Sequence, residues 1–369
     1  MRALYRFAVR FVATSGVLLA TATSGCAVSS GEEVDTIGLR AEAALPRRAG
    51  TVIIDGCVVD PWQKAALARP SAKKVVQTAV LLCLVPRVDG TIGPRDPSAV
   101  LELSRTAESL RAEGYRVTLG IAFTDETGQR YDGGQTSAQL KDPAWRARFV
   151  ETLPLVSAAA DGVEIDLQGL TDDARASVTA LVTETAKVVR PAKTLGVFVP
   201  PSVTTPSDLP GGEAFDRQAL AKTVDRMRVM TLDFSEGRPG PTIEPGWAVD
   251  AARVALRDTG DGAARVDIAY PLYGTDWGPR GRRSITWFDA MAMAQLSQRP
   301  IERGPTGAPF LRYDAFGEPH VAWFDDAEST GRALGAWTFD ALPDTVGVVF
   351  YGLGAEDPEL FERLGARYP

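Results

Sequence analysis

The feature that most constrains the fold of this chain is a repeated alternation of short apolar runs with longer amphipathic segments. Eight runs have the length and the Val, Ile and Leu content of buried strands, and helical periodicity lies between them. Strands that alternate with helices are typical of parallel sheets. The predicted strands are 51–59, 75–85, 116–123, 162–168, 194–200, 228–234, 265–274 and 346–354.

The segments between these runs carry helix signals. Residues 98–114 end at Gly114, a common C-terminal cap, and residues 142–160 begin with Asp142 as N-cap and Pro143 in the first turn. Eight strand–helix units predict an α/β fold, a closed (β/α)8 TIM barrel. An open doubly wound sheet is the alternative, but no glycine-rich nucleotide-binding loop follows an early strand. Further helices are predicted at 172–190, 216–225 and 247–260.

The gap between the seventh and eighth predicted strands is too long for a simple connection. It contains two strand-like runs joined by a tight turn around Gly317, and these are flanked by helical patterns at 284–298 and 327–342. We therefore predict a small α+β insertion on the barrel at about 278–335, between the seventh and eighth strands.

The N-terminus is typical of a bacterial export signal, with basic residues, an apolar run and small residues before Cys26. The Thr-Ser-Gly-Cys sequence resembles a lipoprotein cleavage site, although Thr23 stands where such sites usually have Leu. We predict a lipoprotein-type signal peptide at 1–25, lipidation of Cys26 and a tether at 26–48. Ordinary secretion and an uncleaved anchor are the alternatives. The barrel is expected at 49–369, exported and either membrane-anchored, periplasmic or extracellular.

Charge and the rare residues exclude several classes of function. The chain has 40 Lys and Arg against 47 Asp and Glu, so it has no basic excess for nucleic acid. His320 is the only histidine, which excludes a His-rich metal site. Cys57 and Cys83 lie on neighbouring predicted strands and are either a disulfide pair or two small buried side chains. We expect a monomer with no metal and no organic cofactor.

The fourth predicted strand, in the sequence DGVEIDLQGL (161–170), carries an unusual row of polar side chains. Because side chains alternate along a strand, Glu164, Asp166 and Gln168 share one face while the aliphatic residues share the other. In a barrel that polar face points inward, and its C-terminal end lies at the mouth, where barrel enzymes keep their active sites. Burying two carboxyl groups there is costly unless they share a proton or find donors. The row therefore indicates a functional site more than a structural network.

The order and spacing of several motifs resemble glycoside hydrolase family 18, the chitinase-like barrels. The family's fourth-strand signature is D-G-x-D-x-D-x-E, and this chain has Asp161, Gly162, Glu164, Asp166 and Gln168 at those positions. Later segments are similar to further family motifs. They are VMTLDF (229–234), with Met230 and Asp233, and YPLYGTDW (270–277), with Tyr273 and Trp277. The insertion and the last strand together resemble the subgroup of the family that acts on spore or cell-wall glycans.

The resemblance implies substrate-assisted hydrolysis of β-1,4-linked N-acetylglucosamine polymers. In the family the signature Glu protonates the leaving oxygen, the Asp two residues earlier orients the acetamido group, a sixth-strand Tyr binds that group, and a last-strand Trp forms the subsite floor. Here Gln168, Leu232 and Tyr351 replace the acid, the Tyr and the Trp, whereas Asp166 is retained. A carboxamide has no proton to donate, and loss of a general acid typically costs about 10²–10⁴-fold.

Three functions follow as hypotheses. The first is a non-catalytic glycan-binding protein, expected to bind an N-acetylglucosamine-containing polymer. The second is an active glycosidase with a relocated acid, and the third is an envelope scaffold that uses the barrel exterior or the insertion. The candidate site consists of Asp161, Glu164, Asp166 and Gln168 at the catalytic position, with Asp233, Tyr273, Trp277, Tyr351 and Trp62 as substrate-binding residues. Candidates for a relocated acid are Glu164, Asp233, Glu236, Asp125 and Glu126.

The hypotheses depend on the position of the Gln168 amide. We expect it within about 3.2 Å of Asp166 or another neighbouring group, in a cleft deep enough for a sugar. An amide outside the central pocket would contradict the glycan-binding interpretation.

Overall fold

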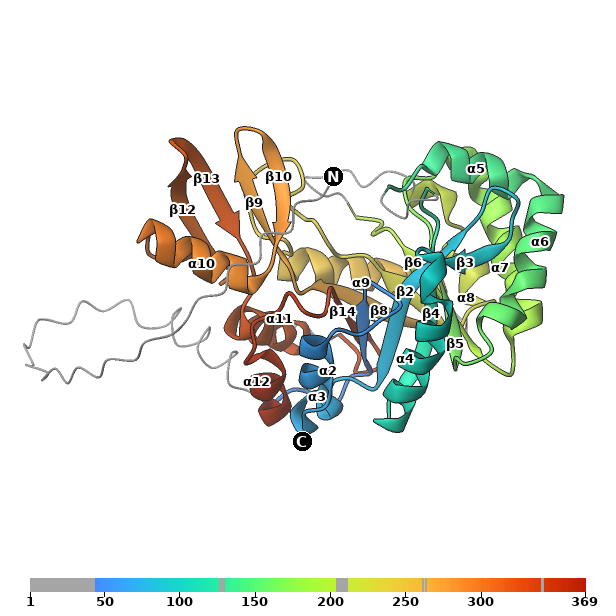
Figure 1. Ribbon diagram of the computed structural model, residues 1–369, viewed down its shortest axis with the longest axis horizontal. Coiled ribbons are helices and arrows are strands. Elements are labelled where there is room, and N and C mark those ends of the chain that lie inside the picture. The colour runs from blue at the N-terminus through green and yellow to red at the C-terminus, as the bar shows by residue number, and fades with distance from the viewer. Residues whose placement is uncertain (1–43, 126–129, 204–211, 261, 263, 340–341) are drawn as a thin grey trace, which may run out of the picture.

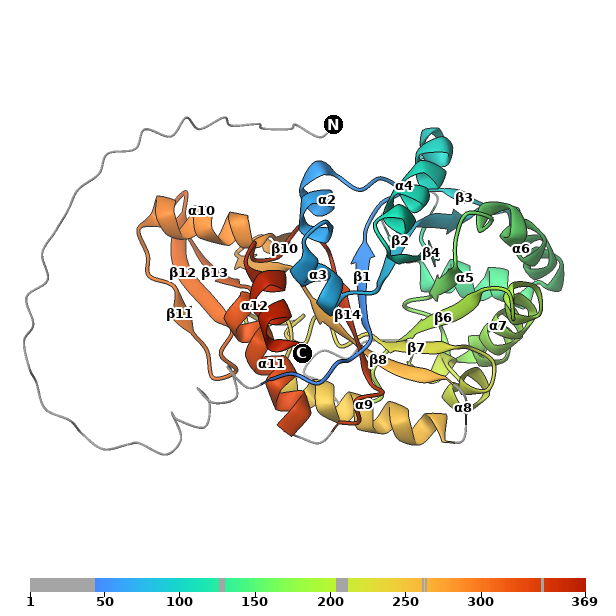
Figure 2. The same ribbon diagram turned by 90° about the horizontal axis from the view of Figure 1, so that it is seen from below.

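The protein is described by a computed structural model, which places residues 44–125, 130–203, 212–260, 262, 264–339 and 342–369. Eight parallel strands form a closed barrel, in which the first strand pairs with both the second and the last of the eight. Figure 2 shows these strands enclosed by helices, with a smaller layer at one side. The predicted (β/α)8 TIM barrel is therefore confirmed, and an open sheet is excluded.

The barrel strands agree with the predicted order. Their bounds differ from the predicted ones by up to five residues, and the largest differences are at the first strand, which ends at Ile54, and the sixth, which ends at Val229. Around the barrel the strands are β1 (Gly50–Ile54), β2 (Thr78–Pro86), β4 (Arg116–Ala122), β5 (Gly162–Asp166), β6 (Thr194–Val199), β7 (Arg226–Val229), β8 (Arg265–Pro271) and β14 (Gly347–Tyr351), and the short β3 (Ile92–Pro94) pairs antiparallel with β2.

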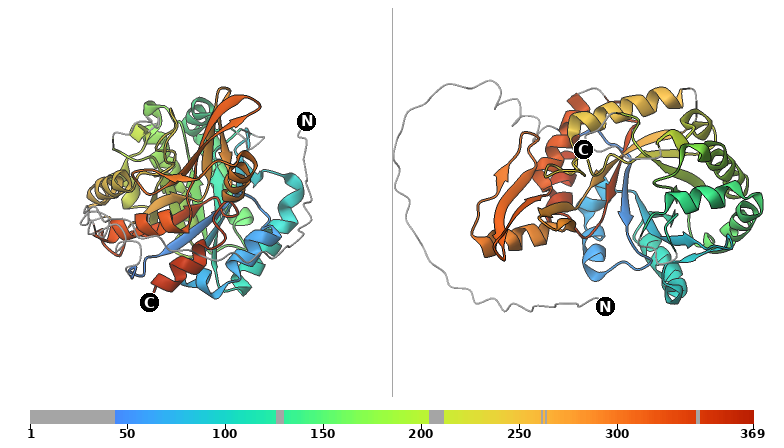
Figure 3. Two further views of the ribbon diagram at one scale, coloured as in Figure 1. Left: turned by 90° about the vertical axis from the view of Figure 1, so that its left-hand side faces the viewer. Right: turned by 90° about the horizontal axis from the view of Figure 1, so that it is seen from above.

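Helices cover the outside of the barrel, as Figure 3 shows from above. Their apolar faces pack on the outward side chains of the strands, so the main core lies between the two layers. Asp142 caps α6 through the backbone N–H of Ala144, as the sequence predicts. The helices are α2 (Pro61–Leu67), α3 (Pro70–Val75), α4 (Val100–Ala112), α5 (Gly133–Lys141), α6 (Pro143–Val156), α7 (Arg175–Val189), α8 (Arg217–Ala221), α9 (Pro245–Thr259), α10 (Trp287–Ser297), α11 (Ala327–Phe339) and α12 (Leu360–Arg367), with 3₁₀ turns η1 (Pro97–Ala99), η2 (Asp172–Ala174) and η3 (Gly212–Ala214).

The insertion between β8 and β14 is a five-stranded antiparallel sheet with α10 packed on it, and it stands beside the barrel in Figure 1. Phe316 and Gly317 form the predicted tight turn, and both have positive φ, of 54° and 80°. The sheet starts at Gly274, earlier than the predicted boundary, and three of its strands were not predicted. In the order of pairing, its strands are β10 (Gly281–Ile285), β9 (Gly274–Gly278), β13 (Glu318–Trp323), β12 (Pro309–Ala315) and β11 (Glu302–Arg303).

The lower part of the barrel interior holds an ionic layer. Arg228 of β7 is 2% exposed and donates to both oxygens of Glu164, at 2.6 and 2.9 Å, and to Asp267 at 2.8 Å. Gly196 and Gly347 make room for this layer, because a Cβ on them would lie 1.8 Å from the Glu164 carboxylate and 2.1 Å from that of Asp267. Pairing with hydrogen bonds is what makes such buried charges tolerable.

A disulfide joins the segment after β1 to β2. Cys57 and Cys83 are bonded, with their Cα atoms 5.1 Å apart, and both side chains are buried. Of the two alternatives that the sequence left open for these residues, the structure has the disulfide.

Candidate functional site

The inward face of β5 leads from the ionic layer to the mouth of the barrel. Val163 and Ile165 point outward into the main core, whereas Glu164 and Asp166 are buried inside. Gln168 follows the strand end and lies highest. Alternation along the strand therefore sends one carboxylate to the structural layer and the next to the mouth.

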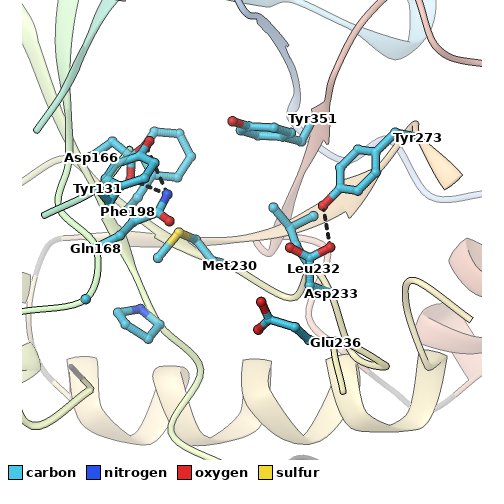
Figure 4. A pocket seen from close by; sticks show the side chains of 12 residues that line it. Tyr131, Asp166, Gln168, Phe198, Met230, Leu232, Asp233, Glu236, Tyr273 and Tyr351 are labelled. Carbon is cyan, nitrogen blue, oxygen red and sulfur yellow. Dashed lines mark hydrogen bonds between the residues drawn. The ribbon is translucent and has the colours of Figure 1, made fainter. Parts of the chain in front are cut away.

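A cavity of about 330 Å³ occupies the mouth of the barrel (Figure 4). This volume is at the small end of the range for ligand pockets. Its lining combines aromatic and aliphatic surface with carboxyl, amide and hydroxyl groups. The lining residues are Tyr131, Asp166, Gln168, Gly169, Phe198, Pro200, Met230, Leu232, Asp233, Glu236, Tyr273 and Tyr351.

Asp166 is the most buried carboxyl group of this cavity, with 2% of its surface exposed. The Tyr131 hydroxyl donates to its Oδ2, and the Gln168 amide nitrogen lies 3.1 and 3.3 Å from its two oxygens. Burial raises the pKa of Asp166 to about 6, although both hydrogen bonds act in the opposite direction. The carboxyl therefore titrates near neutral pH, and Gln168 lies where the sequence analysis expected it.

The start of α5 positions both partners of Asp166. Asp132 caps the helix by accepting from the N–H of Gln135 at 2.9 Å, and this fixes the adjacent Tyr131. Gly133 packs so closely that a Cβ on it would lie 1.6 Å from the carbonyl oxygen of Gly169. Gly169 itself has φ of 64°, a conformation that favours glycine. The backbone after Gln168 is thus held in place by two glycines.

Asp233 and Glu236 line the opposite side of the cavity, in the turn after β7. Asp233 has a left-handed backbone, with φ of 55°, and accepts from the Tyr273 hydroxyl at 2.9 Å. Glu236 forms an ion pair with Arg282 of β10, from the insertion. The barrel and the insertion therefore both contribute to this wall.

Tyr351 ends β14 and lines the cavity on the side opposite Asp166 and Gln168 (Figure 4). Its ring meets Tyr273 edge-on, with centroids 6.2 Å apart and planes at 73°. Burial, followed by the nearby charge of Asp166, raises the pKa of the Tyr351 hydroxyl well above its usual range. Tyr351 is therefore a neutral phenol at any physiological pH.

The structure brings together five of the predicted site residues, and each of the others has a different location. Asp161 lies at the opposite end of β5, where it accepts from Arg111 and from the N–H of Val117. Glu164 lies below the cavity in the ionic layer with Arg228. The five residues that line the cavity are Asp166, Gln168, Asp233, Tyr273 and Tyr351.

The two tryptophans of the predicted site do not line this cavity. Trp277 belongs to β9 of the insertion, where the Arg282 guanidinium lies 6.0 Å from its ring. Trp62 starts α2, is 45% exposed, and contacts the exposed Phe288 of α10. Trp277 instead lines a small recess next to the cavity, together with Asp233 and Glu236.

Three further predicted residues do not line the cavity or cannot be placed. Glu126 and the lipidation site Cys26 fall outside the described residues. Asp125 follows β4 and lines a small recess beside Asp132 instead of the main cavity. Among the candidates for a relocated acid, Asp233 and Glu236 are the two that line the cavity.

The predicted site did not include Tyr131, Phe198 or Met230, which all line the cavity, although Met230 was named in the VMTLDF motif. Tyr131 lies in a loop after β4, and the only nearby signal is the Asp132 N-cap that fixes the start of α5. Phe198 belongs to β6 and points inward by simple alternation, so its position was predictable once β6 was placed.

Two further observations concern the described part of the chain. Within it, no group of three or more His, Cys, Asp and Glu side chains is arranged to hold a metal ion. None of the helices placed by the structure has both the length and the apolar character needed to cross a membrane.

Solved structures with this fold are similar to the chain at low sequence identity. The spore cortex-lytic enzyme SleL of Bacillus cereus is 17% identical, with a TM-score of 0.73 over 88% of this chain and 75% of that one. A chitinase from Chromobacterium violaceum is 18% identical, with a TM-score of 0.70 over 87% and 98%. A Glu-to-Gln mutant of a class V chitinase from Nicotiana tobaccum, in complex with NAG4, is 13% identical, with a TM-score of 0.66 over 87% and 99%. No protein-family model and no curated protein matches the sequence.

These likenesses concern the fold. The chain has the barrel of chitinases and spore cortex-lytic enzymes over nearly nine-tenths of its length. The predicted resemblance to glycoside hydrolase family 18 is therefore confirmed at the level of the fold, and the function of the cavity is a separate question.

Proposed function

We propose that the protein binds a glycan of chitin or peptidoglycan type, which contains N-acetylglucosamine, in the cavity at the barrel mouth, and that it is impaired as a hydrolase. The observation that carries this proposal is the Gln168 amide inside the cavity, hydrogen-bonded to Asp166 at the position where the resemblance expects a proton donor.

The neighbouring groups support impaired hydrolysis. An amide cannot protonate a leaving oxygen, and Glu164 is held by Arg228 below the cavity. Leu232 offers no hydrogen bond where the resemblance expects a Tyr hydroxyl. Standard substrate-assisted hydrolysis needs all of these roles in one subsite.

The lining supports sugar binding. Tyr351 and Phe198 offer aromatic surface, and Asp233 offers a carboxylate to hydroxyl groups. Small-molecule sites typically combine mostly apolar walls with a few convergent polar groups. A sugar ring has both apolar faces and a polar rim, so this lining suits it.

Calorimetry tests the proposal with N-acetylchitotetraose and with soluble peptidoglycan fragments. We expect binding of at least one of them, with no detectable release of shorter oligomers. No heat with any of these glycans, from a protein that unfolds cooperatively, would overturn the proposal. Gln168→Glu is the companion variant, and a gain of hydrolysis would show that only the acid is missing.

A second candidate function is hydrolysis with a relocated acid, which the position of Glu236 favours. Glu236 lines the cavity on the side opposite Asp166, although it is ion-paired with Arg282. This alternative predicts release of shorter oligomers by the unaltered protein. Glu236→Gln should then abolish the release while leaving glycan binding largely intact.

A role as an envelope scaffold is the third candidate, and the exposed contact between Trp62 and Phe288 favours it. We further propose that the protein is exported and attached to a membrane through lipidated Cys26, on the sequence signals given above. Cys26→Ala should move the protein from the membrane fraction to the soluble fraction.

A further inference from the structure

The two chain connections between the insertion and the barrel lie side by side and form a hinge. One leads from Pro271 at the end of β8 to Gly274 at the start of β9. The other leads from Trp323 at the end of β13 to Ala327 at the start of α11. A Cβ on Gly274 would lie 2.5 Å from the carbonyl oxygen of Trp323, so the connections are in close contact. A movement of the insertion relative to the barrel must therefore bend this hinge.

A buried carboxyl group, that of Asp325, lies in the second connection and is 8% exposed. Its Oδ1 accepts from the hydroxyl of Tyr270 in β8 at 2.9 Å and from that of Ser329 in α11 at 2.7 Å. Both of these partners are buried as well. The carboxyl group thus ties the hinge to a barrel strand and to a helix of the outer layer.

The second oxygen of Asp325 lacks such support. Its Oδ2 is buried and has no hydrogen-bond partner among the residues that the structure describes. The adjacent Asp326 has a charge of the same sign, and the guanidinium of Arg303 in β11 is paired with Asp326 at 2.7 Å and with Glu328 at 2.9 Å. An ionised Asp325 therefore keeps a charged oxygen buried without a donor, which is costly.

The other titratable groups around the hinge are engaged with different partners. Arg332 of α11 pairs with Glu328, and the Asp357 carboxylate, after β14, accepts from the N–H of Ala327 at 3.0 Å. Burial raises the pKa of the Tyr270 hydroxyl well above its usual range, so that group stays neutral. Asp325, in contrast, changes charge near neutral pH, because burial raises its pKa to about 6.

A neutral carboxyl group suits this environment better than a charged one. Its O–H can donate to the Ser329 hydroxyl, because a hydroxyl both donates and accepts. Ser329 can then donate to the carbonyl oxygen of Asp326, which is 3.2 Å away. The buried charge disappears while the links to β8 and α11 remain.

We propose that Asp325 is a pH-sensitive latch of this hinge: the insertion is held against the barrel while the Asp325 carboxyl is protonated, and the hinge loosens when the carboxyl ionises. The insertion also holds Glu236 of the cavity lining through Arg282, so the latch is linked to the mouth of the barrel. The proposal concerns the attachment of the insertion, and it does not depend on the ligand of the cavity.

The closed hinge binds the Asp325 proton more tightly than an open hinge does. In the open form water surrounds the carboxyl, and its pKa returns from about 6 to the ordinary value of 3.8. The closed form is therefore favoured at acidic pH, and this advantage is lost as the pH rises through about 6. Between pH 5 and pH 7.5 the ratio of closed to open hinge should fall roughly 10-fold.

Hydrogen–deuterium exchange of the unaltered chain tests the proposal and does not depend on any variant folding. Protection factors, corrected for the intrinsic effect of pH on exchange, are compared for peptides around Asp325 and for peptides of β2. We expect the hinge protection to fall roughly 10-fold between pH 5 and pH 7.5 and then to level off. The hinge should also be less protected than β2, because it opens locally. Constant hinge protection, or protection equal to that of β2, would overturn the proposal.

Asp325→Asn and Asp166→Asn are the matched variants. Asp325→Asn keeps the shape of the side chain but cannot ionise, so its hinge protection should be independent of pH. Asp166 is the control, because it is a buried carboxyl group whose pKa is also raised to about 6 but which lies in the cavity. Its substitution should keep the roughly 10-fold change at the hinge. If Asp325→Asn keeps that change as well, or if Asp166→Asn abolishes it, the proposal is wrong.

Discussion

At the scale of single residues, the pKa of Asp166 is set by two opposing effects of its surroundings. Burial disfavours its charged form, whereas the hydrogen bonds from Tyr131 and Gln168 favour that form. Burial is the larger effect, so the pKa rises from an ordinary value of 3.8 to about 6. A Glu in place of Gln168 would add a second carboxyl beside it and raise one of the two pKa values further.

The raised pKa of Asp166 has a consequence for stability. Between pH 4 and 6 the folded state keeps a proton that the unfolded state has lost, so stability from this group falls as pH rises through that range. We expect Asp166 to favour folding by about 2 kcal/mol more at pH 4.5 than at pH 7.5. Asp166→Asn should remove this difference, measured by urea unfolding at the two pH values.

A second buried carboxyl group should contribute to the same pH dependence of stability, so its contribution must be measured separately. Burial also raises the pKa of Asp325 to about 6, far from the cavity and beside Tyr270 and Ser329. Asp325→Asn should therefore reduce the pH dependence of the free energy of unfolding by a similar amount. The effects of the two substitutions should be additive because their sites do not touch. An Asp166→Asn protein with unchanged pH dependence would contradict the assignment.

Sequence reasoning found the cavity residues that lie on or directly after barrel strands. Asp166, Gln168 and Tyr351 were predictable because alternation along a strand fixes the face of each side chain. It failed for Trp62 and Trp277, because a residue several positions beyond a strand end follows the path of its loop. No local pattern reports that path.

At the scale of elements, β7 places a buried cation inside the barrel, and other strands supply the carboxylates that neutralise it. Arg228 neutralises Glu164 from β5 and Asp267 from β8, so three strands share one ionic layer. The pKa of Arg228 is raised, because its attraction to the two carboxylates outweighs the cost of burial. The layer was not predicted, since Glu164 was grouped with the residues of the mouth.

Arg228→Leu should be strongly destabilising, because it leaves two carboxylates buried without a cation. Removing one member of a buried ion pair costs about 3–5 kcal/mol, which denaturant unfolding measures. Arg226→Leu on the same strand is the control. Arg226 is 27% exposed and shares Asp267, so its loss should cost only about 1 kcal/mol. Equal effects of the two substitutions would contradict the structural role of the layer.

The start of α5 offers a second test at this scale. In Gly133→Ala the new methyl group would meet the Gly169 carbonyl at 1.6 Å, a backbone atom that cannot rotate away. The loop that carries Gln168 must then shift. We expect a loss of roughly 1–3 kcal/mol of stability and weaker glycan binding.

Gly134→Ala is the matched control for this helix start. Its nearest neighbour would be the Asp132 side chain at 3.5 Å, an ordinary contact. Alanine in a helix is more favourable than glycine by up to about 1 kcal/mol, so this variant should be neutral or more stable. Similar losses for both variants would show that helix propensity, and not the contact with Gly169, decides the outcome.

The composition of each strand explains whether it could be predicted from the sequence. All eight barrel strands were found because they are rich in buried aliphatic residues, which run continuously in β2 and alternate with polar residues in β5. The strands β9, β10 and β11 were missed, because most of their residues are polar or glycine. Short antiparallel strands of this kind depend on their partners more than on their own sequence.

At the scale of the whole molecule, the barrel closes between segments that are nearly 300 residues apart. β1 pairs in parallel with β14 on one side and with β2 on the other. Arg48, just before β1, is 3% exposed and donates to the carbonyl oxygens of Leu342, Pro343 and Val346, at 3.1, 2.7 and 3.0 Å. One side chain thus fastens the first strand to the segment that precedes the last.

Arg48→Met tests whether this closure stabilises the molecule as a unit. Methionine keeps a long apolar stem but leaves three carbonyl groups without their donor, and we expect a loss of about 3 kcal/mol. Arg47→Met is the control, because Arg47 is exposed and should contribute little. Urea unfolding should remain a single transition with an unchanged slope, since the barrel has no free edge at which to open separately. A partial transition in Arg48→Met would instead mean that the two ends of the barrel separate before the rest unfolds.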